Sequence, residues 1–75
     1  MTVTVYSSPS CMQCNATKKY LNRMNIEFEE VDVSVNQEAR EELTDLGYTQ
    51  VPVVRFGETH FAGFRPDRLK EIVTA

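Results

Sequence analysis

The only two cysteines among the 75 residues stand three positions apart, at Cys11 and Cys14. They come directly after a Ser-Ser-Pro-Ser turn, which itself follows an apolar run. On the first turn of a helix, two thiols at this spacing can close a disulfide, and the helix dipole stabilises a thiolate at the amino-terminal sulfur. The pattern is typical of dithiol redox chemistry. We therefore expect Cys11 and Cys14 to form a disulfide that opens and closes during function.

The two sulfurs are expected to have unequal roles. Cys11, at the exposed start of the helix, should have a lowered pKa and attack a partner disulfide, and Cys14, one turn deeper, should resolve the mixed disulfide. The alternative for Cys14 alone is a buried packing cysteine. Met12 and Gln13 lie between the sulfurs and should be exposed, where a methionine offers partners an adaptable apolar contact. The alternative is that Met12 and Gln13 only complete the turn and contact no partner.

Two other uses of the cysteines fit the sequence less well. A structural disulfide enclosing so short a loop restrains the unfolded chain far less than a long loop does. A structural zinc site takes four Cys or His ligands, whereas this chain offers two cysteines and the single His60, which is distant in sequence. We expect no bound metal and no cofactor other than the disulfide itself.

Composition indicates an ordinary globular chain, with 41% hydrophobic and 25% charged residues, and we expect one domain over residues 1–75. The net charge of −3 and the scattered basic residues disfavour nucleic-acid binding. No apolar run approaches the length of a membrane span and no secretory signal opens the chain. We expect a cytoplasmic monomer that does not bind membranes.

The first half of the chain predicts a strand, a helix and a second strand. Alternating β-branched residues predict a strand over residues 2–6. From Cys11 to about Met24 there is no Gly or Pro, which predicts a helix with Ser10 as its cap. The apolar positions of the second strand are Ile26, Phe28, Val31 and Val33. Parallel pairing of the two strands across the helix is expected.

The second half predicts a helix, a hairpin and a last helix. Asn36, or a Ser34–Gln37 capping box, begins a helix that a left-handed Gly47 ends. Strands over residues 53–56 and 59–62 flank a Gly57-Glu58 turn, and Pro66 begins the last helix. The apolar positions of the two helices are Ala39, Leu43 and Leu46 in the first and Leu69, Ile72 and Val73 in the second. The element order is βαβαββα, in the α/β class.

This order, with a dithiol after the first strand and a Val-Pro before the third, resembles the thioredoxin superfamily and its glutaredoxin branch. The chain is most similar there to the NrdH-redoxins, through residues 11–19, 47–54 and 63–68. The resemblance implies a thioredoxin fold with a four-stranded mixed sheet flanked by three helices. It also implies a thiol-disulfide oxidoreductase that takes electrons from thioredoxin reductase and passes them to the large subunit of class Ib ribonucleotide reductase.

The resemblance extends to residues around the dithiol. It implies a cis peptide bond before Pro52, with the Val51 backbone available to an extended partner peptide, although a trans proline opening an edge strand is the alternative. It also implies partner contacts at Gly63, Phe64 and Arg65. The family's Trp-Ser before this segment is replaced here by Phe-Ala at residues 61–62, so the hydrogen bonds of those two groups are not carried over.

Two related functions are disfavoured by what the sequence lacks. Glutaredoxins that use glutathione usually carry a lysine shortly before the dithiol and a Gly-Gly with acidic residues before the last helix. This chain has Ser7 and Ser8 at the first place and Gly-Phe-Arg-Pro at residues 63–66. The sequence therefore disfavours two alternatives. One is a glutathione-dependent glutaredoxin, and the other is an iron–sulfur glutaredoxin-like module, which needs glutathione as a co-ligand.

Overall fold

A mixed four-stranded sheet forms the centre of this computed structural model, which describes residues 3–74 and, among these, the side chains up to Ile72. The strands lie in the order β2-β1-β3-β4, with β1 parallel to β2 and antiparallel to β3, and with β3 antiparallel to β4. The elements are β1 (Val3–Ser7), α1 (Met12–Arg23), β2 (Phe28–Asp32), α2 (Gln37–Asp45), β3 (Val53–Phe56), β4 (Thr59–Ala62) and α3 (Pro66–Thr74). The predicted βαβαββα order and the parallel β1–β2 pair are confirmed.

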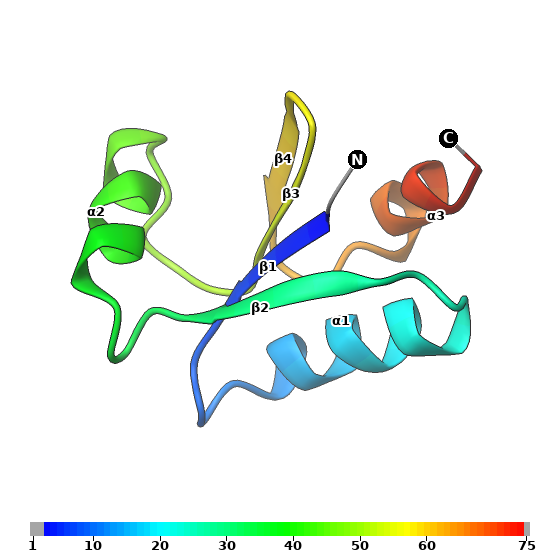
Figure 1. The fold of residues 1–75 in the computed structure, drawn as a ribbon, viewed down its shortest axis with the longest axis horizontal. Helices are drawn as coiled ribbons and strands as arrows, with labels where there is room; N and C mark the ends of the chain where they lie inside the picture. The colour runs from blue at the N-terminus through cyan, green and yellow to red at the C-terminus, as the bar shows by residue number, and fades with distance from the viewer. Residues whose placement is uncertain (1–2, 75) are drawn as a thin grey trace.

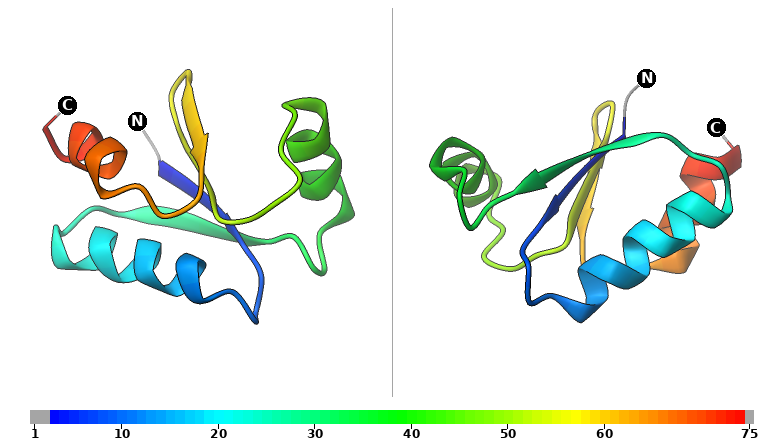
Figure 2. Two further views of the ribbon diagram at one scale, coloured as in Figure 1. Left: turned by 180° about the vertical axis from the view of Figure 1, so that it is seen from behind. Right: turned by 60° about the horizontal axis from the view of Figure 1, so that its bottom comes forward.

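Helices cover both faces of the sheet (Figure 1). Helices α1 and α3 lie on one side and α2 on the other, as both views in Figure 2 also show. The buried cluster under α1 and α3 is Val3, Val5, Leu21, Val54, Phe61, Leu69 and Ile72. The cluster under α2 is Tyr6, Ala39, Leu43 and Val53. Both faces of the sheet therefore carry buried side chains from the central strands β1 and β3.

Strand β2 is shorter than the predicted apolar pattern. Phe28 packs against the cluster under α1 and α3, whereas Val31, three residues later, packs against the cluster under α2. An odd spacing puts side chains on opposite faces of a strand, so these two residues serve two cores. Ile26 and Val33 pack on the same clusters from just outside the strand.

Several element ends differ from the predictions by a residue or two. Strand β1 extends to Ser7, and the predicted first residue of that strand, Thr2, lies outside the described residues. Leu46, which the sequence pattern placed on an apolar helix face, is 42% exposed because α2 ends just before it. Met24, which follows the last residue of α1, is 40% exposed. The side chain of Val73 lies outside those described.

The start and end of α2 follow local chemistry, as predicted. The Asn36 side chain accepts the Ala39 N–H at 3.0 Å, so Asn36 is the cap. Gly47 follows the helix at φ +90°, a conformation that strains any residue with a Cβ. None of the helices within residues 3–74 has the length and apolar character needed to cross a bilayer.

Candidate active site

Cys11 and Cys14 are joined in a disulfide with their Cα atoms 5.2 Å apart, as predicted. Helix α1 begins at Met12, so Cys11 occupies the cap position, and its Sγ accepts the backbone N–H of Cys14 at 3.0 Å. The prediction that Ser10 caps this helix was wrong. The cysteine sulfur takes the hydrogen bond that a serine hydroxyl usually takes at a helix start.

The two sulfurs differ in access to solvent. Cys14 is fully buried, whereas Cys11 is half-buried. Thr17 is also fully buried one turn after Cys14, and its hydroxyl donates to the Gln13 carbonyl at 2.9 Å. This bond ties the first two turns of α1 together beneath the dithiol. A reagent in solution therefore reaches Cys11 first.

Two further loops meet the dithiol at the same end of the sheet (Figure 2, right). The Val51 carbonyl oxygen lies 3.7 Å from Cys11 Sγ; in the disulfide this sulfur carries no proton, so the approach is a contact without a hydrogen bond. The Val51–Pro52 peptide bond is cis. Gly63 N–H donates to the Pro52 carbonyl at 2.7 Å, which holds the loop after β4 against the loop before β3.

Gly63 also lies close to the residues between the sulfurs. Its φ is +86°, and a Cβ built on it would stand 3.9 Å from Gln13 Oε1. Gln13 is exposed and Met12 is 87% exposed, as the sequence predicted for both. The structure thus brings Cys11, Gln13, Val51, Pro52 and Gly63 together around one sulfur.

Phe64 and Arg65 lie beside this group, and each makes a contact with a residue other than the two cysteines. The Phe64 ring, 37% exposed, makes an edge contact with Tyr20 of α1 at a centroid distance of 6.4 Å. Arg65 donates from Nε to the Ala62 carbonyl at 3.2 Å and is otherwise exposed. Both side chains therefore extend the surface around the dithiol toward α3.

A polar group behind the dithiol was not predicted. Ser7, buried at the end of β1, donates to Glu30 Oε2 at 3.2 Å, and Lys18 of α1 forms an ion pair with the same oxygen. The hydrogen bond from Lys18 is the largest cause that lowers the pKa of Glu30 below its ordinary value. The parallel pairing of β1 and β2 brings Glu30 beneath Lys18.

His60 is engaged elsewhere. Its Nδ1 lies 2.5 Å from the Tyr48 hydroxyl, and the two rings meet edge to face. Within the part of the chain that the structure describes, no three His, Cys, Asp or Glu side chains are grouped to hold a metal ion.

The carboxylate of Asp32 accepts hydrogen bonds from both the hydroxyl and the N–H of Ser34, and these bonds lower the pKa of Asp32.

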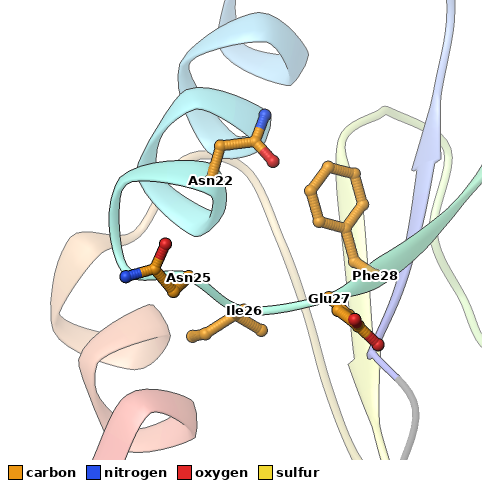
Figure 3. Close-up of a pocket in the computed structure, with 5 residues that line it drawn as sticks. All are labelled: Asn22, Asn25, Ile26, Glu27 and Phe28. Carbon is orange, nitrogen blue, oxygen red and sulfur yellow. The ribbon is translucent and has the colours of Figure 1, made fainter.

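One cavity lies away from this chemistry. It has a volume of about 710 Å³ and is lined at the turn from α1 to β2 by Asn22, Asn25, Ile26, Glu27 and Phe28. Figure 3 shows the Asn22 amide and the Phe28 ring on opposite sides of it. A twelve-residue helix is about 18 Å long, so the length of α1 separates this cavity from Cys11.

Comparison with known proteins places the dithiol in a family. The glutaredoxin family model matches residues 3–61. The glutaredoxin-like protein NrdH of Salmonella typhimurium is 38% identical over 72 residues, which span 96% of this chain and 89% of that protein. The NrdH protein of Lactococcus lactis subsp. lactis is 37% identical over 70 residues, with 93% and 97% covered.

A solved structure supports the same assignment. The glutaredoxin-like NrdH-redoxin from Escherichia coli superposes with a TM-score of 0.93 at 38% identity, covering 96% of this chain and 95% of that one. The thioredoxin-like fold with three helices around a mixed sheet, predicted from the sequence, is thereby confirmed. The chain belongs to the glutaredoxin family and, within it, to the NrdH glutaredoxin-like redoxins that work through a Cys-x-x-Cys disulfide.

Proposed function

We propose that this redoxin donates two electrons to the large subunit of class Ib ribonucleotide reductase and is itself reduced by thioredoxin reductase, as a monomer in the cytoplasm. The observation that carries the redox role is the asymmetric dithiol, with Cys11 accessible at the cap of α1 and Cys14 buried behind it. Family membership supports the choice of partners. The Escherichia coli relative is described as having a thioredoxin-like activity profile, which favours thioredoxin reductase as the electron source.

The reaction begins from the reduced redoxin. The Cys11 thiolate attacks one sulfur of the partner disulfide, forms a mixed disulfide and releases the other partner sulfur as a thiolate. Cys14 then loses its proton and attacks Cys11 Sγ, which releases the second partner thiolate. Two electrons have passed to the partner, its thiolates take up protons, and the redoxin is left with the disulfide seen here. The dithiol of the reductase restores the starting state by the reverse exchange.

The backbone N–H of Cys14 supports the attacking state. It donates to Cys11 Sγ across the cap of α1, and this bond becomes charge-assisted when the sulfur is a thiolate. The helix dipole acts in the same direction. Both effects stabilise the Cys11 thiolate. This is the form that attacks a partner disulfide, and it is also the form released when the disulfide of the redoxin is reduced.

The surface around Cys11 supports docking of a partner chain. Met12 and Gln13 project between the sulfurs, and Val51 presents its backbone beside them. Pro52 and Gly63 join the two loops under this surface, with Phe64 and Arg65 at its border. We propose that an incoming peptide lies over this surface with its disulfide at Cys11.

Glutathione is the disfavoured electron source. Ser7 and Ser8 stand in the region where glutaredoxins usually carry a lysine, and Ser7 is buried and donates its hydroxyl hydrogen to Glu30. Neither serine presents a cation to a glutathione carboxylate. Residues 63–66 supply Gly-Phe-Arg-Pro in place of the Gly-Gly and acidic groups.

The test measures NADPH oxidation with two electron sources. One assay contains thioredoxin reductase and the other glutathione with glutathione reductase, each with class Ib ribonucleotide reductase as acceptor. We expect turnover with thioredoxin reductase, none with Cys11→Ser, and a trapped mixed disulfide with Cys14→Ser. Faster turnover with glutathione would reject the proposed electron source, and full turnover by Cys14→Ser would reject the dithiol mechanism.

A further inference from the structure

The sheet has an open edge at β4, one residue away from the group around Cys11. Within residues 3–74, strand β4 pairs only with β3, and Gly63, which follows it directly, donates to Pro52 and adjoins Gln13. The short strand therefore leads from the dithiol along the side of the molecule. A partner chain that reaches Cys11 can continue beside it.

The register shows which backbone groups face outward. In antiparallel pairs, hydrogen-bonded and non-hydrogen-bonded positions alternate. The bond from Gly63 N–H to Pro52 fixes that pair as hydrogen-bonded, so Ala62 and His60 are non-hydrogen-bonded positions and Phe61 is bonded to Val54. The N–H and C=O groups of His60 and Ala62 therefore point away from β3. Of these four groups, only the Ala62 carbonyl is hydrogen-bonded within residues 3–74, where it accepts from Arg65 Nε.

Two arginines stand at this edge. The Arg68 guanidinium lies over the Phe61 ring at 5.6 Å from its centroid. Its Nε forms an ion pair with Glu71 Oε2 at 3.8 Å, which is too long for a hydrogen bond, and this buried N–H has no hydrogen-bond acceptor in the described part of the chain. Arg65 is the second arginine, and its Nε donates to the carbonyl of Ala62, the last residue of β4. Nε itself is closed to solvent, but the Arg68 side chain is 41% exposed, so a carboxylate from outside the chain can pair with the exposed part of the guanidinium.

A cavity of about 290 Å³ runs along the same edge. Its lining consists of Tyr48, His60, Phe61, Ala62, Arg65 and Arg68. None of these residues is acidic, although the chain as a whole carries a net charge of −3. Cationic and aromatic groups are thus concentrated next to free strand groups, which is the combination that selects an acidic peptide in extended form.

We propose that β4 is a docking edge, at which an extended acidic segment of the disulfide-bearing partner adds as a fifth strand. The segment's backbone bonds His60 and Ala62, and a glutamate or aspartate opposite Phe61 meets the Arg68 guanidinium. This inference rests on the proposed function for the identity of the partner as a protein that exchanges a disulfide with Cys11. It assigns the edge strand and Arg68 a role in selecting that protein.

The test uses the whole oxidised chain labelled with nitrogen-15 and needs no turnover, so it is independent of the assay for the proposed function. The probe is a capped six-residue peptide that alternates valine and glutamate, and its control replaces each glutamate with glutamine. We expect the amide signals of His60 and Ala62 to move most on titration. The Phe61 amide, which faces β3, is the internal control and should move little.

Variants of Arg68 test the charge pairing. Arg68→Gln should weaken binding of the acidic peptide about fivefold, the size of one exposed ion pair, whereas Arg23→Gln at the end of α1 removes the same charge and should change it less than about twofold. Arg68→Lys keeps the charge and should restore most of the affinity, which separates lost pairing from lost packing on Phe61.

Four results would overturn the inference. These are equal affinity for the glutamate and glutamine peptides, unmoved His60 and Ala62 amides, an Arg68→Gln variant that binds as well as the native chain, and the same amide shifts produced by inorganic phosphate alone. The last result would assign the edge to a small anion. Larger shifts with the acidic peptide than with phosphate, confined to the β4 edge, support the docking strand.

Discussion

Alkylation of the reduced protein should separate the two cysteines by rate. Cys14 is fully buried at the start of α1, so a reagent reaches it only when the first turn opens. Opening breaks the bond from Cys14 N–H to Cys11 Sγ and the bond from Thr17 Oγ1 to the Gln13 carbonyl. Each such bond contributes about 1 kcal/mol net.

Exposure of the Cys14 side chain adds the cost of hydrating a small apolar group, about 1–2 kcal/mol. The total of about 3–4 kcal/mol corresponds to an open fraction of roughly one in 100 to one in 1,000. Cys11 needs no such opening. At equal intrinsic reactivity, Cys14 should therefore react about 100 to 1,000 times more slowly.

The measurement uses iodoacetamide and mass spectrometry on two single-thiol variants, Cys11→Ser and Cys14→Ala. Serine at residue 11 keeps a capping oxygen, so α1 should remain formed in that variant. In concentrated guanidinium chloride the two rates should converge, which controls for local sequence effects. If the two thiols of the folded variants react within about tenfold of each other, the burial argument fails and with it the assignment of attacking and resolving roles.

Three further changes test the fold around the site. Leu21→Ala removes a fully buried side chain under α1 and should cost about 2–5 kcal/mol in urea unfolding; a cost below about 1 kcal/mol would contradict the packing. The pKa of Glu30 is lowered by Lys18, so its contribution to stability is present above its ordinary pKa of 4.5 and is lost as the pH falls. Glu30→Gln should flatten the fall in stability below about pH 5 and cost under about 1 kcal/mol at pH 7, since the side chain is 43% exposed; an unchanged acid slope would disprove the pairing. Asn25 ends α1 at φ 59°, so Asn25→Ala should cost about 1 kcal/mol in thermal unfolding while Asn25→Gly is tolerated, and equal losses would count against the left-handed end.

Local chemistry allowed much of the fold to be predicted. The hairpin strands over residues 53–56 and 59–62 have the predicted bounds, and Asn36 and Gly47 bound α2 as expected. Each of these features depends on a few adjacent residues whose backbone preferences agree. The disulfide between Cys11 and Cys14 was predictable for the same reason, because both sulfurs belong to one helical turn.

Contacts between distant segments were beyond the reach of the sequence pattern. The ion pair of Lys18 with Glu30 depends on β1 and β2 lying parallel in one particular register. The contact of Tyr48 with His60 depends on the loop after α2 folding back toward the edge strand. Polar residues at these positions are common on any solvated surface, so nothing in their spacing marks them as partners.

The cap of α1 is Cys11 and not the predicted Ser10, and this position explains the spacing of the two cysteines. A cap side chain accepts the N–H of the third helical residue, and with Met12 as the first that residue is Cys14. The same interval of three residues places the two Cα atoms 5.2 Å apart, within the range a disulfide requires. Had Ser10 been the cap, its hydroxyl would have faced Gln13, and the Cys11 sulfur would have lost the N–H that stabilises its thiolate. Capping geometry and disulfide geometry therefore select the same spacing, and the exchanging sulfur depends on both.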